Sequence, residues 1–234
     1  MPKVTEEYIK NKKQMIVETA YKLCLQKTVS TVTMQDVINA SGLSQGGIYR
    51  FYKDIDEIFK DMITELRRKA NIKLQIDDIF STAEEDGAKV IIHKIFELLG
   101  DYMTKELMGI VKINFELSVL TMNAPDRVEK ILGDQKEVGN FEYIFLRTTQ
   151  YFREEIAQGR MKMRVSEEQL LSYVASSYNG IEMSCIVNHC YRKLPLGEMY
   201  VPKTQLKTLE TTVLYLLGLD EKIGEYINET DLYK

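Results

Sequence analysis

The stretch from Ser44 to Lys53 gathers a carboxamide, a guanidinium, an ammonium group and two tyrosine hydroxyls. The amide of Gln45 can form two hydrogen bonds with the edge of an adenine. Gly46 and Gly47 carry no side chain that would hold the backbone away from a groove of DNA. The hydroxyl and cationic groups suit phosphate oxygens. The residues expected to contact DNA are Thr33, Ser44, Gln45, Gly46, Gly47, Tyr49, Arg50, Tyr52 and Lys53.

Two short helices joined by a tight turn would present these groups. Thr33 followed by Asp36 predicts the start of the first helix, as a capping-box-like pair with an acidic side chain in place of the usual Glu or Gln. Gly42 predicts its end, because glycine adopts a left-handed backbone without strain. Ser44 is a favourable N-cap for the second helix, which Ile48 can anchor. This layout is typical of a DNA-binding helix-turn-helix. The alternative is a small bundle whose core contains the aromatic residues and whose loop contains the glycine pair.

Composition and charge favour a globular protein with one basic end. The 234 residues are 44% hydrophobic and 28% charged, with a net charge of -4. Residues 1–69 contain 12 Lys and Arg against 9 Asp and Glu, a net charge of +3, whereas the remainder has a net charge of -7. A basic end on an acidic body is expected when only that end meets phosphate, although uneven charge also arises by chance. Three cysteines at irregular spacing, with no signal sequence or membrane-spanning run, favour the cytoplasm.

Apolar residues recur at helical spacing throughout the chain, so we expect an all-α protein. A polar stretch within residues 71–86 predicts the boundary between a DNA-binding domain at 1–70, whose last helix could extend to about 86, and a helical domain at 87–234. Residues 107–122 are apolar nearly all round and predict a central, buried helix. Residues 125–158 predict one long helix with weak points at Gly133 and Gly139, and a short last helix is expected after Asp220.

The N-terminal motifs occur together in a known order. They are Ile16, Ala20, Leu23 and Cys24 in the first helix, Thr33, Val37 and Ile38 in the second, the turn Ser41-Gly42-Leu43-Ser44, and Gly46, Ile48, Tyr49 and Tyr52 in the third. This stretch resembles the TetR family of bacterial one-component transcriptional repressors. The resemblance implies an N-terminal three-helix DNA-binding domain and a larger helical domain that binds an effector and dimerises. Ile55 stands where the family usually has a basic residue, which puts one phosphate contact in doubt, although Lys53 lies close enough to replace it.

Two or three bases read by one helix would give weak binding, so we expect a two-fold homodimer on double-stranded operator DNA. The last two long helices offer the best apolar surface for it. The expected interface residues are Ile181, Cys185, Leu206, Leu209, Val213, Leu216 and Leu217. The alternative is that this stripe belongs to the core of each subunit.

A repressor that responds to a ligand needs a cavity in its helical body. Aromatic and methionine side chains with isolated polar groups suit an apolar small molecule, with a planar or a cationic ligand as alternatives. The candidate lining residues are Tyr102, Met103, Asn114, Glu116, Met122, Phe145, Tyr151, Phe152, Tyr178 and Asn179. Ordinary core packing is the alternative for each of them.

Catalytic and metal chemistry find little support. Cys185 and His189 are one helical turn apart, but two neighbouring ligands do not make a metal site. The chain has two histidines and lacks a phosphate-binding glycine loop or a Ser/His/Asp grouping, so neither an enzyme nor a cofactor is expected. The remaining alternative to a ligand-released repressor is a helical module that sequesters a ligand or binds a protein and has lost its operator.

Overall fold

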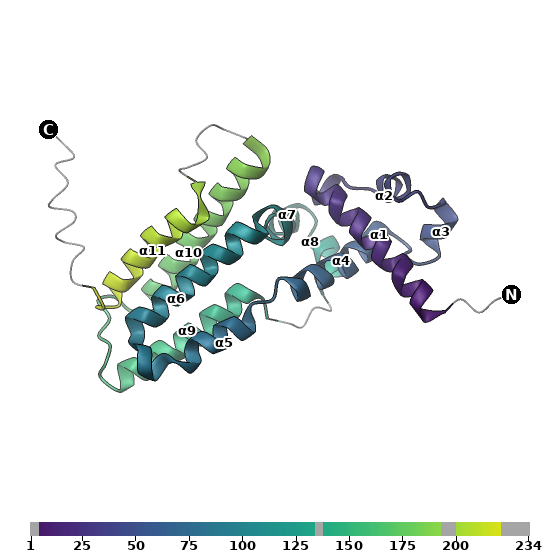
Figure 1. Ribbon diagram of the computed structural model, residues 1–234. Helices are drawn as coiled ribbons and strands as arrows, with labels where there is room; N and C mark the ends of the chain where they lie inside the picture. Colours follow the sequence, from purple (N-terminus) through teal and green to yellow (C-terminus); the bar gives the residue numbers. More distant parts are fainter. Residues whose placement is uncertain (1–4, 134–137, 193–199, 221–234) are drawn as a thin grey trace. The chain divides into compact units, whose positions relative to one another are not determined.

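Figure 1 shows the chain as a computed structural model, which describes residues 5–133, 138–192 and 200–220. The regular elements among these residues are all helices, which confirms the predicted fold class. Residue contacts divide the chain into two compact units. The first unit comprises Met1–Ala70 and Met108–Glu137, and the second comprises Asn71–Leu107 and Val138–Lys234. The prediction had one boundary, whereas these contacts group residues 108–137 with the N-terminal unit.

The first unit is a bundle built on two long helices. Its elements are α1 (Glu6–Gln26), the 3₁₀ turn η1 (Val29–Thr31), α2 (Met34–Ser41), α3 (Gln45–Tyr49), α4 (Ile55–Lys69), α7 (Lys112–Asn123) and α8 (Pro125–Leu132). Helix α1 packs on α2 and α4, α4 packs on α8, and α7 packs on η1 and α8. One core joins them, with Ile16, Val37, Ile48 and Phe59 fully buried and Ile113 of α7 among them.

Local capping sets where the helices of the first unit begin and end. Thr33 and Asp36 form a reciprocal capping box at α2, as the sequence predicts. Gly42 follows α2 at φ 68°, a left-handed conformation that a side chain would strain. The Ser44 hydroxyl accepts a hydrogen bond from the amide of Gly47, and the Asp54 carboxylate accepts one from Glu57 to start α4.

The segment expected as one central helix at 107–122 is interrupted. A π-helical turn, η2 (Leu107–Val111), precedes α7, and Gly109 within it has the non-helical angles φ -104° and ψ -114°. Helix α7 is also less enclosed than its composition suggested, because Met122 is 83% exposed. An apolar sequence thus indicated burial for a helix that has one solvent-facing edge.

The second unit is made of the helices α5 (Lys73–Ser81), α6 (Ala83–Glu106), α9 (Asn140–Ala157), α10 (Glu167–Ile186) and α11 (Pro202–Leu216), with a π-helical turn η3 (Val187–Arg192) after α10. Helix α11 packs on α6 and α10, while α5 packs on α6 and α9. The expected polar junction at 71–86 is largely helical, and the expected long helix at 125–158 is two helices, α8 and α9. The helix expected after Asp220 lies outside the described residues. No described helix has the length and hydrophobicity of a membrane span.

Candidate nucleic-acid interface and ligand cavity

Helix α3 is held from one side only. Ile48 is fully buried and fixes the helix to the core of the first unit. Tyr49 is 45% exposed, and Gln45, Gly46 and Arg50 are exposed as well. A Cβ built on Gly46 would meet no atom within 4 Å, so the outer surface of α3 is bare at that position. The helix therefore presents an amide, a phenol and a guanidinium around an uncovered stretch of backbone, as a DNA-binding helix requires.

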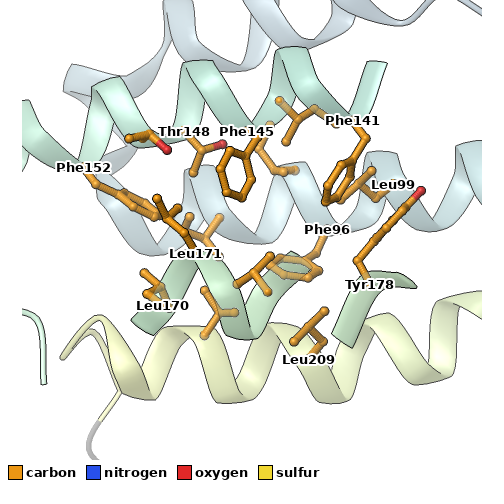
Figure 2. A pocket seen from close by; sticks show the side chains of 16 residues that line it. Phe96, Leu99, Phe141, Phe145, Thr148, Phe152, Leu170, Leu171, Tyr178 and Leu209 are labelled. Carbon is orange, nitrogen blue, oxygen red and sulfur yellow. The ribbon is translucent and has the colours of Figure 1, made fainter. Parts of the chain in front are cut away.

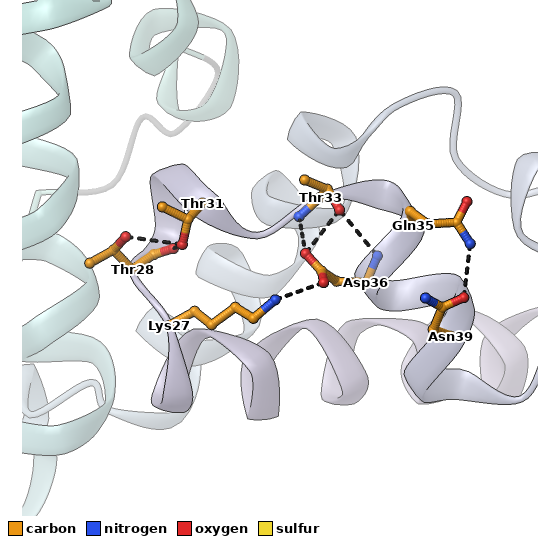
Figure 3. Close-up of polar contacts among 7 residues, drawn as sticks. All are labelled: Lys27, Thr28, Thr31, Thr33, Gln35, Asp36 and Asn39. Carbon is orange, nitrogen blue, oxygen red and sulfur yellow. Dashed lines mark hydrogen bonds and ion pairs between the residues drawn. The ribbon is translucent and has the colours of Figure 1, made fainter.

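Thr33, at the start of α2, is exposed but already engaged (Figure 3). Its hydroxyl accepts the amide hydrogen of Asp36 at 3.1 Å and donates to the Asp36 carboxylate at 2.9 Å. Lys27 binds the same carboxylate at 2.7 Å, and these hydrogen bonds from Lys27 and Thr33 lower the pKa of Asp36 to about 2. To donate to a phosphate, the Thr33 hydroxyl would thus have to break its hydrogen bond to the Asp36 carboxylate.

The exposed face of α2 has two amide side chains that the sequence interpretation missed. Gln35 donates to Asn39 at 2.8 Å, one helical turn apart (Figure 3). Both residues are exposed. Their spacing of four along a predicted helix could have identified them as a polar face next to the turn.

Tyr52 does not face solvent, contrary to its expected role in phosphate binding. It is 2% exposed, and its hydroxyl donates to Asp61 at 2.9 Å. The Lys13 ammonium lies 4.8 Å from the centre of its ring and 3.4 Å from the Asp61 carboxylate. Burial, followed by the hydrogen bond to Asp61, raises the pKa of Tyr52. Tyr52 lies four residues after the anchor Ile48, and this helical spacing could have indicated a core position.

The segment between α3 and α4 is fixed by acidic residues and by α8. Lys53 is exposed, and its backbone amide donates to Glu57 at 2.8 Å. Lys130 of α8 binds Asp54 at 2.6 Å, which raises the pKa of the Lys130 ammonium. Arg127 of α8 binds Asp56 at 2.8 Å. These cations offset carboxylates at the start of α4, and sequence analysis could not place them there because α8 lies more than 70 residues away.

Ile55, which replaces a residue that is usually basic, is partly buried and packs against the core of the first unit. A phosphate contact at this point of the chain would therefore have to come from its exposed neighbour Lys53.

A buried ion pair connects α7 to the end of α1. The Lys112 ammonium lies 2.7 Å from the Glu116 carboxylate, and their side chains are 4% and 7% exposed. Lys112 also donates to the carbonyl oxygens of Cys24 at 2.7 Å and Lys27 at 3.3 Å. Glu116 accepts the amide hydrogen of Val29 at 2.7 Å. The cation thus meets unpaired carbonyls at a helix C-terminus, and the carboxylate meets an amide at the start of the next turn.

We predict that Lys112→Met lowers the free energy of unfolding by about 3–5 kcal/mol, because it leaves the Glu116 carboxylate buried without its counter-charge. The matched control is Lys69→Met, which removes the more exposed i,i+4 partner of Glu65 and should cost under about 1 kcal/mol. Urea unfolding measures both values. Adding Glu116→Leu to Lys112→Met should recover part of the loss. Equal effects for Lys112→Met and Lys69→Met would contradict the assignment.

The second unit encloses a cavity of about 60 Å³ between α6, α9, α10 and α11. Its lining is Ile92, Ile95, Phe96, Leu99, Phe141, Ile144, Phe145, Thr148, Thr149, Phe152, Leu170, Leu171, Val174, Tyr178, Leu209 and Val213. The rings of Phe141 and Tyr178 stack with centroids 4.1 Å apart. Figure 2 shows phenylalanine rings from α6 and α9 around this space.

Three of the candidate pocket residues line this cavity, namely Phe145, Phe152 and Tyr178. Glu116 and Asn114 belong to the first unit, where Glu116 binds Val29 and Asn114 accepts a hydrogen bond from Arg67 at 3.5 Å. The other candidates lie outside the lining: Met103 is buried, Tyr102 is partly buried, Asn179 and Met122 are exposed, and Tyr151 packs edge-on against Phe80. Periodicity identified core positions but could not assign them to one core.

Most of the expected dimer stripe lies inside the subunit. Cys185, Leu206, Leu209, Val213 and Leu217 are each less than 5% exposed, whereas Ile181 and Leu216 are partly exposed. A shallow groove on α10 and α11 instead offers Tyr173, Ser177, Gly180, Ile181, Ser184, Gln205, Thr208, Leu209 and Thr212. The buried residues of the stripe therefore belong to the core of the subunit, as the alternative had it. Ile181 is partly exposed and lines the groove.

Metal-ligating groups do not cluster in the part of the chain that the structure describes. The Cys185 thiol donates to the carbonyl of Tyr200 at 3.0 Å, and a ring nitrogen of His189 lies 2.9 Å from the Cys185 carbonyl. Burial raises the pKa of the Cys185 thiol to about 11, so it is a poor thiolate ligand at neutral pH.

Comparison with known proteins finds a family match near the N-terminal end of the chain. Residues 16–62 match the model of "Bacterial regulatory proteins, tetR family". A curated relative, the uncharacterized HTH-type transcriptional regulator YfiR of Bacillus subtilis (strain 168), is 36% identical over 62 residues. That match covers 26% of this chain and 30% of the relative's length.

Solved structures are similar over nearly the whole chain. Salmonella enterica GusR has a TM-score of 0.56 at 17% identity, and the likeness covers 92% of this chain and 99% of that one. A protein of Syntrophomonas wolfei described as a TetR-family regulator has a TM-score of 0.55 at 16% identity, covering 90% and 99%. A TetR-family regulator of Mesorhizobium loti has a TM-score of 0.57 at 12% identity, and the likeness covers 88% of this chain and 96% of that one. At these identities the likeness establishes the fold.

Proposed function

We propose that this chain, which has the DNA-binding domain and the fold of TetR-family transcriptional regulators, represses transcription from an operator and leaves it when a small molecule fills the cavity of the second unit. The observation that supports this most directly is α3. It is anchored by the buried Ile48, exposes Gln45, Tyr49 and Arg50, and lies within the segment that matches the family model.

DNA binding would begin with α3 in the major groove. Gln45, at the helix N-terminus, would read a base edge, and Gly46 would let the backbone approach the bases. Tyr49, Arg50 and Lys53 would bind phosphates and hold the helix in register. So few contacts give specificity only when two copies bind successive half-sites, so a homodimer is part of the proposal.

The groove on α10 and α11 is the surface we propose for the second copy. Small residues line it, including Ser177, Gly180 and Ser184. A Cβ on Gly180 would meet nothing within 4 Å in the subunit, so this part of α10 is open to close approach by another helix. Ile181 of the expected stripe contributes an apolar contact at the same face.

Ligand release would act through the chain that joins the units. Helix α6 lines the cavity with Ile92, Ile95, Phe96 and Leu99 and runs on into η2 and α7. Helix α7 is tied to α1 by the Lys112–Glu116 pair. A ligand that binds more tightly when α6 is in one position would favour that state of the protein. If the favoured state cannot bind the operator, the ligand lowers the fraction of protein that can.

The principal alternative is a helical module that has kept the fold and sequesters a ligand or binds a protein without contacting an operator. The partly buried Ile55 in place of a basic residue favours it. The matched domain and the similar folds belong to regulators, so we propose that the protein has no catalytic activity. We also propose that it acts in the cytoplasm, where its operator would be.

We predict that Arg50→Ala weakens binding to a labelled fragment from upstream of its own gene by about tenfold, because the arginine of each subunit no longer binds a phosphate. The slope of log affinity against log salt should fall by about 1 for each phosphate that is no longer bound. Fluorescence anisotropy measures both quantities. Arg153→Ala, which removes an exposed arginine of the second unit, should leave both unchanged. Failure of the wild type to bind any genomic fragment at low salt would favour the sequestering module.

We predict that Gly180→Arg gives a folded monomer, because the new side chain fills the open groove on α10. Sedimentation velocity would show the shift in mass, and operator affinity should drop at least tenfold since two half-sites are no longer bound together. Thr104→Arg adds the same charge at an exposed position of α6 and should remain dimeric. A dimeric Gly180→Arg variant would place the interface elsewhere.

A further inference from the structure

The cavity of the second unit is walled by carbon atoms. No charged side chain is among the described residues that line it. Thr148 and Thr149 of α9 are lining residues, but less than 1 Å² of each hydroxyl oxygen is accessible, so they offer the cavity their carbon atoms. Figure 2 shows the hydroxyl of Tyr178 at the end of its ring that points away from Phe96. A molecule inside the cavity would therefore meet almost no hydrogen-bonding surface.

This wall restricts the polar groups that a ligand can carry. A hydroxyl that leaves water for such a site gains no hydrogen bond in return, and this loss weakens binding by at least about fivefold. A carboxylate or an ammonium group would lose its hydration without gaining a counter-charge, which excludes both. The ligand that suits this chemistry is a hydrocarbon.

Aromatic rings from three helices reach the cavity. Phe96 belongs to α6, Phe141, Phe145 and Phe152 belong to α9, and Tyr178 belongs to α10. The rest of the lining from α10 and α11 is aliphatic, namely Leu170, Leu171, Val174, Leu209 and Val213. The faces and edges of aromatic side chains attract another ring beyond the effect of the area that they bury. A flat aromatic hydrocarbon therefore suits this lining.

The size of the cavity determines what has to happen when a ring enters. Its volume is about 60 Å³, whereas an engineered protein cavity of about 150 Å³ with a similar lining binds benzene. A ring can thus enter only if the surrounding helices move apart, because closely packed side chains yield little space. Such a ligand binds a widened cavity more tightly than the one described, and this difference lets it shift the population between two states.

We propose that the cavity binds a small aromatic hydrocarbon without polar substituents, and that it widens around this ligand. This inference rests on the proposed function in taking the cavity as the effector site. It adds the chemical class of the effector. It also adds the reason why binding changes the protein, which is that the ring needs more space than the cavity has.

The test uses the full-length protein without DNA and three probes of similar size, namely toluene, benzyl alcohol and benzoate. Ligand-detected NMR titration gives each affinity for the wild type and for variants of Val174, a partly buried lining residue. Val174→Phe fills the cavity, whereas Val174→Ala enlarges it. Val90→Phe adds the same volume at an exposed position of α6 outside the lining and is the matched control.

We expect the wild type and Val90→Phe to bind toluene at least about fivefold more tightly than benzyl alcohol, and not to bind benzoate. Val174→Phe should lose toluene binding. Val174→Ala should bind toluene about 3- to 10-fold more tightly than the wild type, because the ring then displaces less of the wall. If Val174→Phe does not fold, the affinity of Val174→Ala decides.

Three results overturn the proposal: tighter binding of benzyl alcohol than of toluene, no binding of toluene at millimolar concentration, or equal toluene affinity in the wild type and Val174→Ala. The effect of toluene on operator affinity is measured separately. Toluene binding with the expected preferences but without a change in operator affinity would support the class of ligand and contradict the proposed release from the operator.

Discussion

The buried ion pair between Lys112 and Glu116 is the interaction on which the arrangement of the first unit depends. A helix that ends in a protein interior leaves carbonyl groups without partners, and a turn that begins there leaves amides without partners. Here the Lys112 ammonium donates hydrogen bonds to the carbonyls of Cys24 and Lys27. The Glu116 carboxylate accepts one from the amide of Val29. These hydrogen bonds, together with the packing of Ile113 in the shared core, hold α7 against the end of α1. The first unit is therefore discontinuous in sequence, made of residues 1–70 together with 108–137.

Placing α7 and α8 in that unit has two consequences. The first is electrostatic: Arg127 and Lys130 of α8 pair with Asp56 and Asp54 at the start of α4, so these carboxylates face a cation in the protein. The second bears on the proposed ligand release, since α6 lines the cavity and its chain continues through η2 into α7. A helix–helix contact made of hydrocarbon could slide, whereas a cation and an anion bonded to specific backbone groups fix α7 against α1.

The sequence was informative where structure is decided locally. The Thr33–Asp36 box, the left-handed Gly42 and the Ser44 cap depend on residues within a few positions of one another, and all three were predictable. Tyr52 was misplaced because its hydroxyl binds Asp61 on the following helix. Glu116 was assigned to a ligand pocket because it is a polar residue in an apolar helix, yet its partner Val29 is 87 residues away. Helical periodicity recognised Phe145, Phe152 and Tyr178 as inward-facing, but only packing distinguishes the cavity wall from the interior beside it.

The role of this ion pair is tested most directly by the hydrogen exchange of single amides, followed by NMR. The Val29 amide lies in a short turn between helices, where exchange is ordinarily fast. If Glu116 accepts its hydrogen bond, Val29 should exchange as slowly as the interior amides of α1. In a Lys112→Met, Glu116→Leu double variant, Val29 should lose much of that protection while the interior of α1 keeps its own. Fast exchange of Val29 in the wild type, at the rate of an open turn, would contradict the claim that this ion pair fixes α7 in the first unit.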